Sequence, residues 1–288
     1  MDGFLNIYKP KGITSFDVIR FLRRKSGIKK MGHIGTLDPA AEGVLVVAIG
    51  QATKLIEFMM DHDKKYMAEV LLGKKSTTYD SEGEITELSS QKPTEKEILK
   101  VLKSFLGKIE QVPPVYSAIK ISGKRAYNLA RAGEKIEMKK RNVVIHSIEM
   151  NDYNYPIVVL LIHCGAGTYI RSIANDLGEK LGVGGYLNSL KRTAVDNFIV
   201  DESCDMDEIE KNGIEKYIIP IERGVSEISK IYITQQEYTE LQNGRFVKKE
   251  MPKGVAICAA IFNNTLVGIV EETKDGQFIK FKKQIHLN

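Results

Sequence analysis

The stretch Gly-His-Ile-Gly-Thr-Leu-Asp-Pro-Ala-Ala-Glu-Gly-Val-Leu-Val-Val-Ala-Ile occupies residues 32–49 and joins two kinds of sequence. Its second part, Val44–Ile49, is an uninterrupted apolar run, which is typical of a strand buried on both faces. Its first part, Gly32–Glu42, is punctuated by glycine and proline and predicts a loop. Reactive side chains are often held on loops beside rigid strands. We therefore expect a core strand with a candidate site at its start.

The predicted loop carries His33 and Asp38 between two glycines and Pro39. Proline restricts the residue before it to extended conformations, so the direction of the Asp38 carboxylate is constrained. Aspartate before proline is also common in ordinary turns. The pair alone therefore does not decide between a site and a turn, and a second segment is needed.

That second segment is Gly165-Ala-Gly-Thr-Tyr-Ile-Arg171, which leads from a predicted strand into an amphipathic helix. Arg171 follows Ile170 on the helical wheel and lies beside the apolar stripe. A guanidinium in that place can pair with a carboxylate from another part of the chain. A solvent-facing arginine at the start of a helix is the alternative reading. The stripe itself is formed by Ile170, Ile173, Ala174, Leu177 and Leu181.

Further elements follow outward from these two segments. Thr14 or Ser15 is predicted to cap a helix with Phe16, Ile19 and Leu22 on one face, ended by Gly27. Thr94 and Glu97 form a capping box for another helix. Strands are predicted at residues 3–7, 66–72, 143–148 and 157–163. Because strands and helices alternate without a βαβ rhythm, we predict an α+β fold with a mixed or antiparallel sheet.

The sequence changes character at about Ile228. One short helix capped by Thr234 is followed by strand-like segments, with Asn263-Asn264 as a turn between two of them. We predict two domains, residues 1–227 and a small β-rich unit of residues 228–288. In residues 229–288, nine Lys and Arg against six Asp and Glu give a net charge of +3.

Charge and cysteine content restrict the partners and the compartment. The chain of 288 residues has a net charge of +5, and no acidic residue lies between Asp17 and Asp38. A local basic stripe of this kind suits a polyanion partner, although a solvated helix face is the simpler reading. Three scattered cysteines indicate a reducing cytoplasm, and no membrane segment is expected. The stripe consists of Arg20, Arg23, Arg24, Lys25, Lys29 and Lys30.

Several kinds of chemistry lack their motif. Gly165-x-Gly167 is followed by Ile170 instead of the third glycine of a dinucleotide site, and position 68 is Ala where a P-loop needs glycine. The five histidines show no metal-binding spacing, and His62 is predicted to lie in a surface loop. We therefore expect chemistry on a carboxylate, with no metal and no cofactor.

From Gly3 to about Phe198, the sequence closely resembles the TruB family of tRNA pseudouridine synthases. Five short segments in the family's order carry the resemblance. The first departs from the family's usual Asp-Lys-Pro, since position 8 is Tyr. The segments are residues 3–15 (Gly-Phe-Leu-Asn-Ile-Tyr-Lys-Pro-Lys-Gly-Ile-Thr-Ser), 32–54, 63–66 (Asp-Lys-Lys-Tyr), 111–120 (Gln-Val-Pro-Pro-Val-Tyr-Ser-Ala-Ile-Lys) and 167–172 (Gly-Thr-Tyr-Ile-Arg-Ser).

The resemblance implies roles for particular residues. Asp38 matches the catalytic aspartate, Tyr66 a tyrosine against the target base, and Arg171 the arginine paired with that aspartate. Positions that contact the target nucleotide or lie near the cleft are matched by His33, Tyr169, Leu190, Lys9 and Lys120. The implied reaction is isomerisation of one uridine in the tRNA T-loop, at position 55. The C-terminal unit resembles a PUA-like RNA-binding domain.

The resemblance also implies the partners and leaves rivals open. The expected partner is the T-stem-loop of tRNA, bound by a cytoplasmic monomer that needs no obligate protein partner and no membrane. A non-catalytic tRNA-binding or tRNA-folding protein on the same fold is the first rival. An H/ACA-guided enzyme is the second, and it would need protein and guide-RNA partners. A metal nuclease is a distant third, because the acidic cluster it needs is missing from the sequence.

Overall fold

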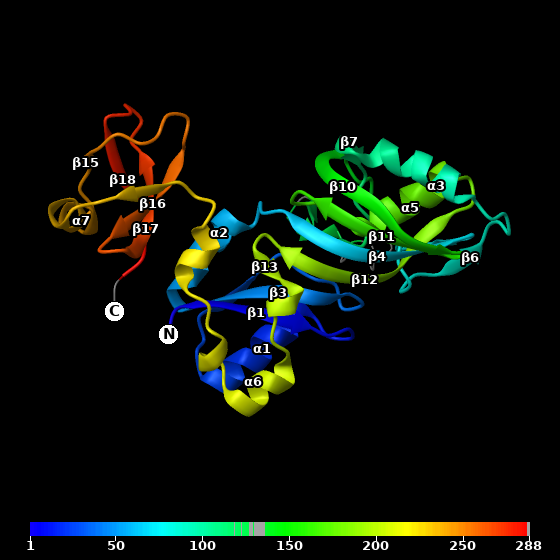
Figure 1. The fold of residues 1–288 in the computed structure, drawn as a ribbon, viewed down its shortest axis with the longest axis horizontal. Coiled ribbons are helices and arrows are strands. Elements are labelled where there is room, and N and C mark those ends of the chain that lie inside the picture. Colours follow the sequence, from blue (N-terminus) through cyan, green and yellow to red (C-terminus); the bar gives the residue numbers. More distant parts are fainter. Residues whose placement is uncertain (118, 122, 127–128, 130–135, 287–288) are drawn as a thin grey trace.

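The computed structural model describes residues 1–117, 119–121, 123–126, 129 and 136–286. Within these residues, nine strands form one large sheet and five form a smaller sheet near the C-terminus. Figure 1 shows the two sheets side by side along the long axis of the molecule, with helices packed against both. The predicted α+β class is confirmed.

The large sheet has the strand order β1-β3-β12-β4-β11-β10-β7, with β2 paired to β3 and β13 paired to β12. Only the β12–β3 pair is parallel among the described pairs of this sheet, so the sheet is mixed. The strands are β1 (Gly3–Lys9), β2 (Met31–Ile34), β3 (Glu42–Ile49), β4 (Lys64–Leu72), β7 (Gly107–Gln111), β10 (Arg141–Asn154), β11 (Ile157–Cys164), β12 (Gly185–Val195) and β13 (Phe198–Ile199).

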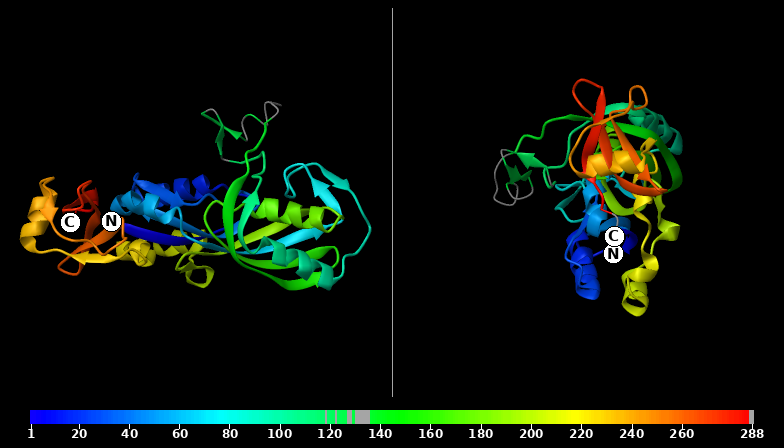
Figure 2. Two further views of the ribbon diagram at one scale, coloured as in Figure 1. Left: turned by 90° about the horizontal axis from the view of Figure 1, so that it is seen from above. Right: turned by 90° about the vertical axis from the view of Figure 1, so that its left-hand side faces the viewer.

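Helix α7 packs on the smaller sheet, and the other helices and two short ribbons lie around the large one. The β8–β9 ribbon stands away from the body of the molecule in Figure 2. The helices are α1 (Ser15–Ser26), α2 (Ile56–Met59), α3 (Glu95–Leu102), α5 (Ile170–Lys180), α6 (Met206–Asn212) and α7 (Gln235–Gln242). The ribbons are β5 (Lys74–Ser76) with β6 (Ile85–Glu87), and β8 (Lys120–Ile121) with β9 (Lys124–Arg125).

Helix α1 packs on β1 and β3 through Val18, Ile19 and Leu22. Thr14 is its N-cap in a capping box with Asp17, and Gly27 ends it in the left-handed conformation at φ 71°. The caps are as predicted, because they depend on neighbours within one turn. The predicted face was wrong at one position, since the Phe16 side chain is 53% exposed. The buried stripe runs through position 18 instead.

The loop predicted at residues 32–42 is shorter in the structure. Its first residues form β2, which pairs antiparallel with β3 from Met31 to Ile34. Strand β3 is buried along nearly its whole length, as its apolar run predicted. The remaining loop of residues 35–41 therefore connects two paired strands, β2 and β3, which fix its two ends.

Helices α3 and α5 cover the other half of the large sheet. Leu177 and Ile173 of α5 pack with Ile98 and Leu102 of α3 over β4 and β11. Gly178 lies so close to the backbone of Gly185 that a Cβ there would collide with it. The missing side chain therefore lets α5 lie directly against the start of β12.

Strand β12 joins the two halves of the sheet, because it pairs parallel with β3 and antiparallel with β4. The junction is tight at Gly43, which has φ 104° and lies against the backbone of Arg192. Any side chain at position 43 would both strain the backbone and clash with that residue. The loop that carries Asp38 is thus held close to β12.

The smaller sheet has the order β14-β16-β17-β18-β15. The Asn263-Asn264 turn between β16 and β17 has positive φ at both residues, as its sequence predicted. The boundary at residue 228 stays a prediction, since the sheet shares an apolar cluster with the large one through Ala259, Ile261 and Phe4. The strands are β14 (Lys230–Tyr232), β15 (Val247–Lys248), β16 (Ile257–Phe262), β17 (Thr265–Glu272) and β18 (Phe278–Gln284).

The two ends of the described chain lie near each other in both figures. Gln51 donates to the carbonyl of His286 at 2.6 Å and accepts from its N–H at 2.8 Å. In the part of the chain that the structure describes, no helix combines the length and apolarity needed to cross a bilayer.

Candidate active site

The loop that carries Asp38 is fastened to the first turn of α1. Ser15 Oγ donates to the carbonyl of Leu37 and accepts from its N–H, both at 2.9 Å. The N–H of Gly12 donates to the carbonyl of Pro39 at 2.8 Å. Asp38 therefore lies between two tethered residues, while its side chain remains 45% exposed. Such a carboxylate is both positioned and accessible.

Arg171 comes to this carboxylate from the first turn of α5. Its Nη2 atom lies 3.1 Å from Asp38 Oδ2 and donates to the carbonyl of Tyr116 at 3.0 Å. Its Nη1 atom lies 3.0 Å from Asp80 Oδ2. The Arg171 side chain is only 9% exposed, so one buried guanidinium bridges two carboxylates. The planar fork of arginine suits such a bridge, which a lysine ammonium cannot reproduce.

Asp80 was missed by the sequence analysis. Its side chain is 8% exposed, and its Oδ1 atom accepts from the Thr78 hydroxyl and, at 3.1 Å, from the N–H of Glu82. Its backbone bridges to Leu187 of β12. A polar residue among polar neighbours carries no local sign of burial, so nothing in the sequence pattern distinguished it.

Tyr66 lies on β4 directly opposite Arg192 of β12. Burial raises the pKa of the Tyr66 hydroxyl, and the Arg192 guanidinium opposes that shift. The phenol therefore stays protonated at neutral pH. Its ring is half-buried, which leaves part of it free to contact a ligand.

Arg192 is a second residue that the sequence analysis missed. It is 1% exposed, and its guanidinium donates to the carbonyls of Val44 at 2.7 Å and Gly35 at 3.0 Å. It thus ties β12 to both ends of the Asp38 loop. A buried arginine with backbone acceptors is recognisable only once the strands are in place.

Lys9 ends β1 beneath the same loop and is fully buried. Its ammonium donates to the carbonyls of Pro10 and Ile13 at 2.8 Å each, and reaches that of Pro39 at 3.5 Å. Burial lowers the pKa of Lys9 to about 8, although the Asp38 carboxylate acts in the opposite direction. Lys9 therefore connects the Asp38 loop to the segment between β1 and α1 through these backbone carbonyls.

Lys120 was also predicted to lie near the cleft. Its backbone belongs to β8, but its side chain lies outside the residues whose side chains the structure describes. Its predicted place near the cleft stays a prediction.

Tyr169 is the N-cap residue of α5. Gln111 holds its backbone by donating to its carbonyl at 3.0 Å and accepting from its N–H at 2.8 Å. The Arg141 guanidinium lies 4.5 Å from the centre of its ring. Tyr169 thus offers a fixed aromatic ring two residues before Arg171.

His33 and Leu190 lie on strands that border the Asp38 loop. His33 is half-buried on β2 opposite Val47, and its Nδ1 atom has no hydrogen-bond partner. Burial, together with the charge of Arg192, lowers the pKa of His33, so its imidazole is neutral at neutral pH. Leu190 is partly buried on β12 opposite Ala68 of β4.

The basic stripe lies on and after α1, and its residues differ in whether they already have a partner. Arg20 pairs with Asp17, and Lys25 pairs with Glu210. Arg23 donates to the carbonyl of Met31 at 3.3 Å. Arg24, Lys29 and Lys30 are exposed and have no acidic partner among the described residues. These three offer the strongest attraction to a polyanion.

Comparison with known proteins identifies the family of the chain. A family model described as TruB family pseudouridylate synthase (N terminal domain) matches residues 23–170. Another, the tRNA pseudouridylate synthase B C-terminal domain, matches residues 171–226. A tRNA pseudouridine synthase B from Clostridium tetani is 41% identical over 96% of this chain and 97% of its own. One from Carboxydothermus hydrogenoformans is 45% identical over 87% of each chain.

Solved structures share the fold. A chain in a Cbf5-Nop10-Gar1 complex has a TM-score of 0.74 and 25% identity over 98% of this chain and 84% of its own. A chain in an H/ACA RNP bound to a substrate RNA has a TM-score of 0.75 and 22% identity over 99% of this chain and 85% of its own. The fold and the relatives together define a pseudouridine synthase, an enzyme of the isomerase class. The chain belongs to the TruB family, as its motifs predicted.

Proposed function

We propose that the protein converts uridine to pseudouridine at position 55 in the T-loop of tRNA, with Asp38 as the catalytic carboxylate. The observation that carries this proposal is the half-exposed Asp38 carboxylate, fixed 3.1 Å from the buried Arg171 guanidinium. The tRNA pseudouridine synthase B relatives support tRNA as the substrate.

The reaction exchanges one bond of the nucleoside for another. The bond between N1 and C1′ breaks, the uracil turns, and a bond between C5 and C1′ forms, while the proton on C5 is lost and N1 gains one. Atoms and electrons balance without an oxidant or a second substrate. A positioned carboxylate can attack C1′, attack C6 of the uracil, or remove a sugar proton, and each route divides one difficult step into easier ones.

The neighbouring residues are suited to hold the uridine out of its stack. A base inside a folded loop cannot reach a carboxylate until it is flipped into a pocket. We assign Tyr66 to stacking on the flipped base, a contact worth about 1–3 kcal/mol. Tyr169 and Leu190 form the surrounding walls, and the neutral His33 fills the gap that the base leaves.

Two surfaces are proposed to bind the tRNA backbone. The first is the basic stripe on and after α1, in which Arg24, Lys29 and Lys30 have no acidic partner among the described residues. The second is the C-terminal unit, proposed as a PUA-like RNA-binding domain. A hollow of about 290 Å³ on that unit is lined by Arg245, Phe246 and Lys280, among others. Cations beside exposed aromatic rings suit a polyanion that carries bases.

We also propose that the protein acts as a cytoplasmic monomer without an obligate protein partner. The three cysteines are free and buried, which suits a reducing compartment. Light scattering of the purified protein, alone and with tRNA, tests the oligomeric state. A stable dimer in both samples contradicts the monomer.

The decisive experiment is incubation of the purified protein with an unmodified tRNA transcript, followed by mapping of pseudouridine. We expect one modified position, in the T-loop, at full conversion. A transcript with cytidine at that position is the control and should remain unmodified. Tight tRNA binding without any pseudouridine would support the rival, a tRNA-binding or tRNA-folding protein on the same fold.

A further inference from the structure

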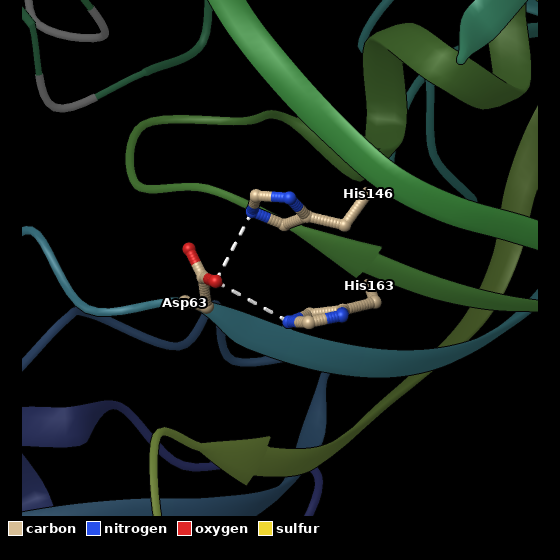
Figure 3. A group of neighbouring side chains, drawn as sticks. All are labelled: Asp63, His146 and His163. Carbon is tan, nitrogen blue, oxygen red and sulfur yellow. Dashed lines mark ion pairs between the residues drawn. The ribbon is translucent and has the colours of Figure 1, made fainter. Parts of the chain in front are cut away.

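Three side chains on the large sheet converge outside the candidate active site. Asp63 directly precedes β4, while His146 lies on β10 and His163 on β11. Figure 3 shows both imidazole rings presenting a nitrogen to the same carboxylate oxygen. The Nε2 atoms of His146 and His163 lie 3.1 and 3.4 Å from Asp63 Oδ2. We propose that this cluster is a binding site for a divalent transition-metal ion of the zinc type.

The distances fit the coordination of such an ion. Zinc binds imidazole nitrogen and carboxylate oxygen at roughly 2.0–2.2 Å in a tetrahedron, whose edges are then about 3.3–3.6 Å long. The two separations between imidazole nitrogen and carboxylate oxygen, 3.1 and 3.4 Å, are close to these edge lengths. All three donor atoms lie within 4.8 Å of one another. A small adjustment of the side-chain torsions therefore brings them around one ion.

The backbone is arranged to bring the two histidines together. Strand β10 has a bulge between Ile145, which faces Cys164, and Ser147, which faces His163. His146 is therefore the extra residue of the bulge, and a bulge redirects the side chain that it inserts. The two rings lie 4.7 Å apart at an angle of 44°, both on the face opposite the α5 layer.

Asp63 is held in place from the other side. Its backbone carbonyl accepts from the N–H of Asp196 at 2.9 Å, and the next residue, Lys64, pairs with Cys164 of β11. The three donors thus come from β10, from β11 and from the residue before β4, which are neighbours in one sheet. A bound ion would fasten the beginning of β4, three residues before Tyr66, to β10 and β11.

The donor set selects the kind of ion. Two imidazoles and one carboxylate suit zinc, nickel or copper, whereas magnesium prefers oxygen ligands and retains its waters. The side chains of Asp63, His146 and His163 are 43%, 39% and 34% exposed. A fourth position is therefore open to water or another ligand, unlike a closed structural site. Lys65, opposite His163, adds a positive charge on this face that weakens binding of any cation.

The histidine spacing did not reveal this site, because His146 and His163 are 17 positions apart and Asp63 lies far before both. His62, the neighbour predicted to lie in a surface loop, is not a member. Its side chain is 15% exposed and its Nδ1 atom lies 3.1 Å from Asp196 Oδ2. His62 does lie in a loop as predicted, but its imidazole is mostly buried and is not at the surface.

The test is titration of tag-free, chelator-treated protein with zinc by calorimetry. We expect one ion per chain and a higher midpoint of thermal unfolding with zinc than without. Cobalt should give the visible absorption bands of a tetrahedral ion with nitrogen and oxygen ligands. His163→Gln and His146→Ala should each weaken zinc binding by roughly tenfold or more and remove the thermal shift.

His286→Gln is the matched control, because it removes one exposed histidine outside the cluster and should leave binding unchanged. Circular dichroism without metal checks that each variant is folded. Magnesium at the same concentration should not shift the unfolding midpoint. The proposal is overturned if the unaltered protein binds less than one zinc per chain, or if both cluster variants bind zinc as tightly as it does.

Discussion

Two carboxylates share the guanidinium of Arg171, yet they lie in regions of opposite character. Asp38 belongs to the short loop between β2 and β3, and its side chain is 45% exposed. Asp80 lies in the turn after β5, and its side chain is 8% exposed. The same ion-pair partner therefore serves an accessible group and a buried one. The comparison indicates a division of labour, in which Asp38 meets the substrate and Asp80 holds the arginine.

Removal of the accessible carboxylate should have the largest effect. In Asp38→Asn, the amide is neither a competent nucleophile nor a base, so we expect single-turnover pseudouridine formation to fall by about a thousandfold or more. Binding of tRNA, measured by filter retention, should change less than threefold. Turnover close to that of the unaltered protein would remove Asp38 from the mechanism and end the comparison.

Replacement of the Arg171 guanidinium should cause the second-largest loss of rate. Arg171→Ala leaves two carboxylates without their cation, and we expect a rate loss of roughly a hundredfold or more with tRNA affinity nearly unchanged. Arg171→Lys should recover little of this loss, because one ammonium cannot reach both carboxylates in the geometry of the fork. Full recovery of the rate by lysine would show that only the charge matters.

Loss of the buried carboxylate should have a smaller effect on rate and a clear effect on stability. Asp80→Asn keeps the shape but removes the charge from a buried ion pair, so we expect a loss of roughly 1–3 kcal/mol in the free energy of unfolding. The rate should fall by less than in Asp38→Asn, because Arg171 still contacts Asp38. Chemical denaturation and single-turnover assays on the same preparation measure both. An equal rate loss in the two variants would contradict the division of labour.

Lys9, which contacts the Asp38 loop, permits a test of how the pKa of a buried ammonium affects the stability of the protein. Its pKa of about 8 in the folded protein lies below the usual 10.5, so below pH 8 it is charged in both states and its burial costs stability. Between about pH 8 and 10.5 the unfolded chain binds the extra proton, and the free energy of unfolding should rise, by at most about 3 kcal/mol. In Lys9→Met this rise should be absent. Parallel pH profiles for the two proteins would show that Lys9 has no depressed pKa.

The smallest effects on chemistry are expected for the basic stripe. An Arg24→Ala, Lys29→Ala, Lys30→Ala triple variant should reduce the slope of log affinity against log salt by about 2. The single-turnover rate at saturating protein should stay within about twofold. The double variant Arg20→Ala, Lys25→Ala is the matched comparison and should change the slope less, because both residues already have acidic partners. Equal slopes in all three proteins would make the stripe a solvated surface.

The sequence by itself determined the features that depend on near neighbours. The caps at Thr14, Thr94 and Thr234 involve side chains and N–H groups only three residues apart. The β3 strand was predictable because a continuous apolar run of this length is typical of a strand buried in the core. Asp38 was singled out by its glycine- and proline-rich surroundings and by the family's motifs.

Only the tertiary structure decided which distant residues meet. Asp80 and Arg171 are 91 residues apart, and Arg192 reaches Gly35 across 157 residues. The Asp63, His146 and His163 cluster exists because a bulge in β10 and the order of three strands bring its members together. Such contacts leave no periodicity and no spacing in the chain, because their geometry is set by sheet register and not by local backbone preference. The buried Asp80 and Arg192 were therefore recognised only once the strands were in register.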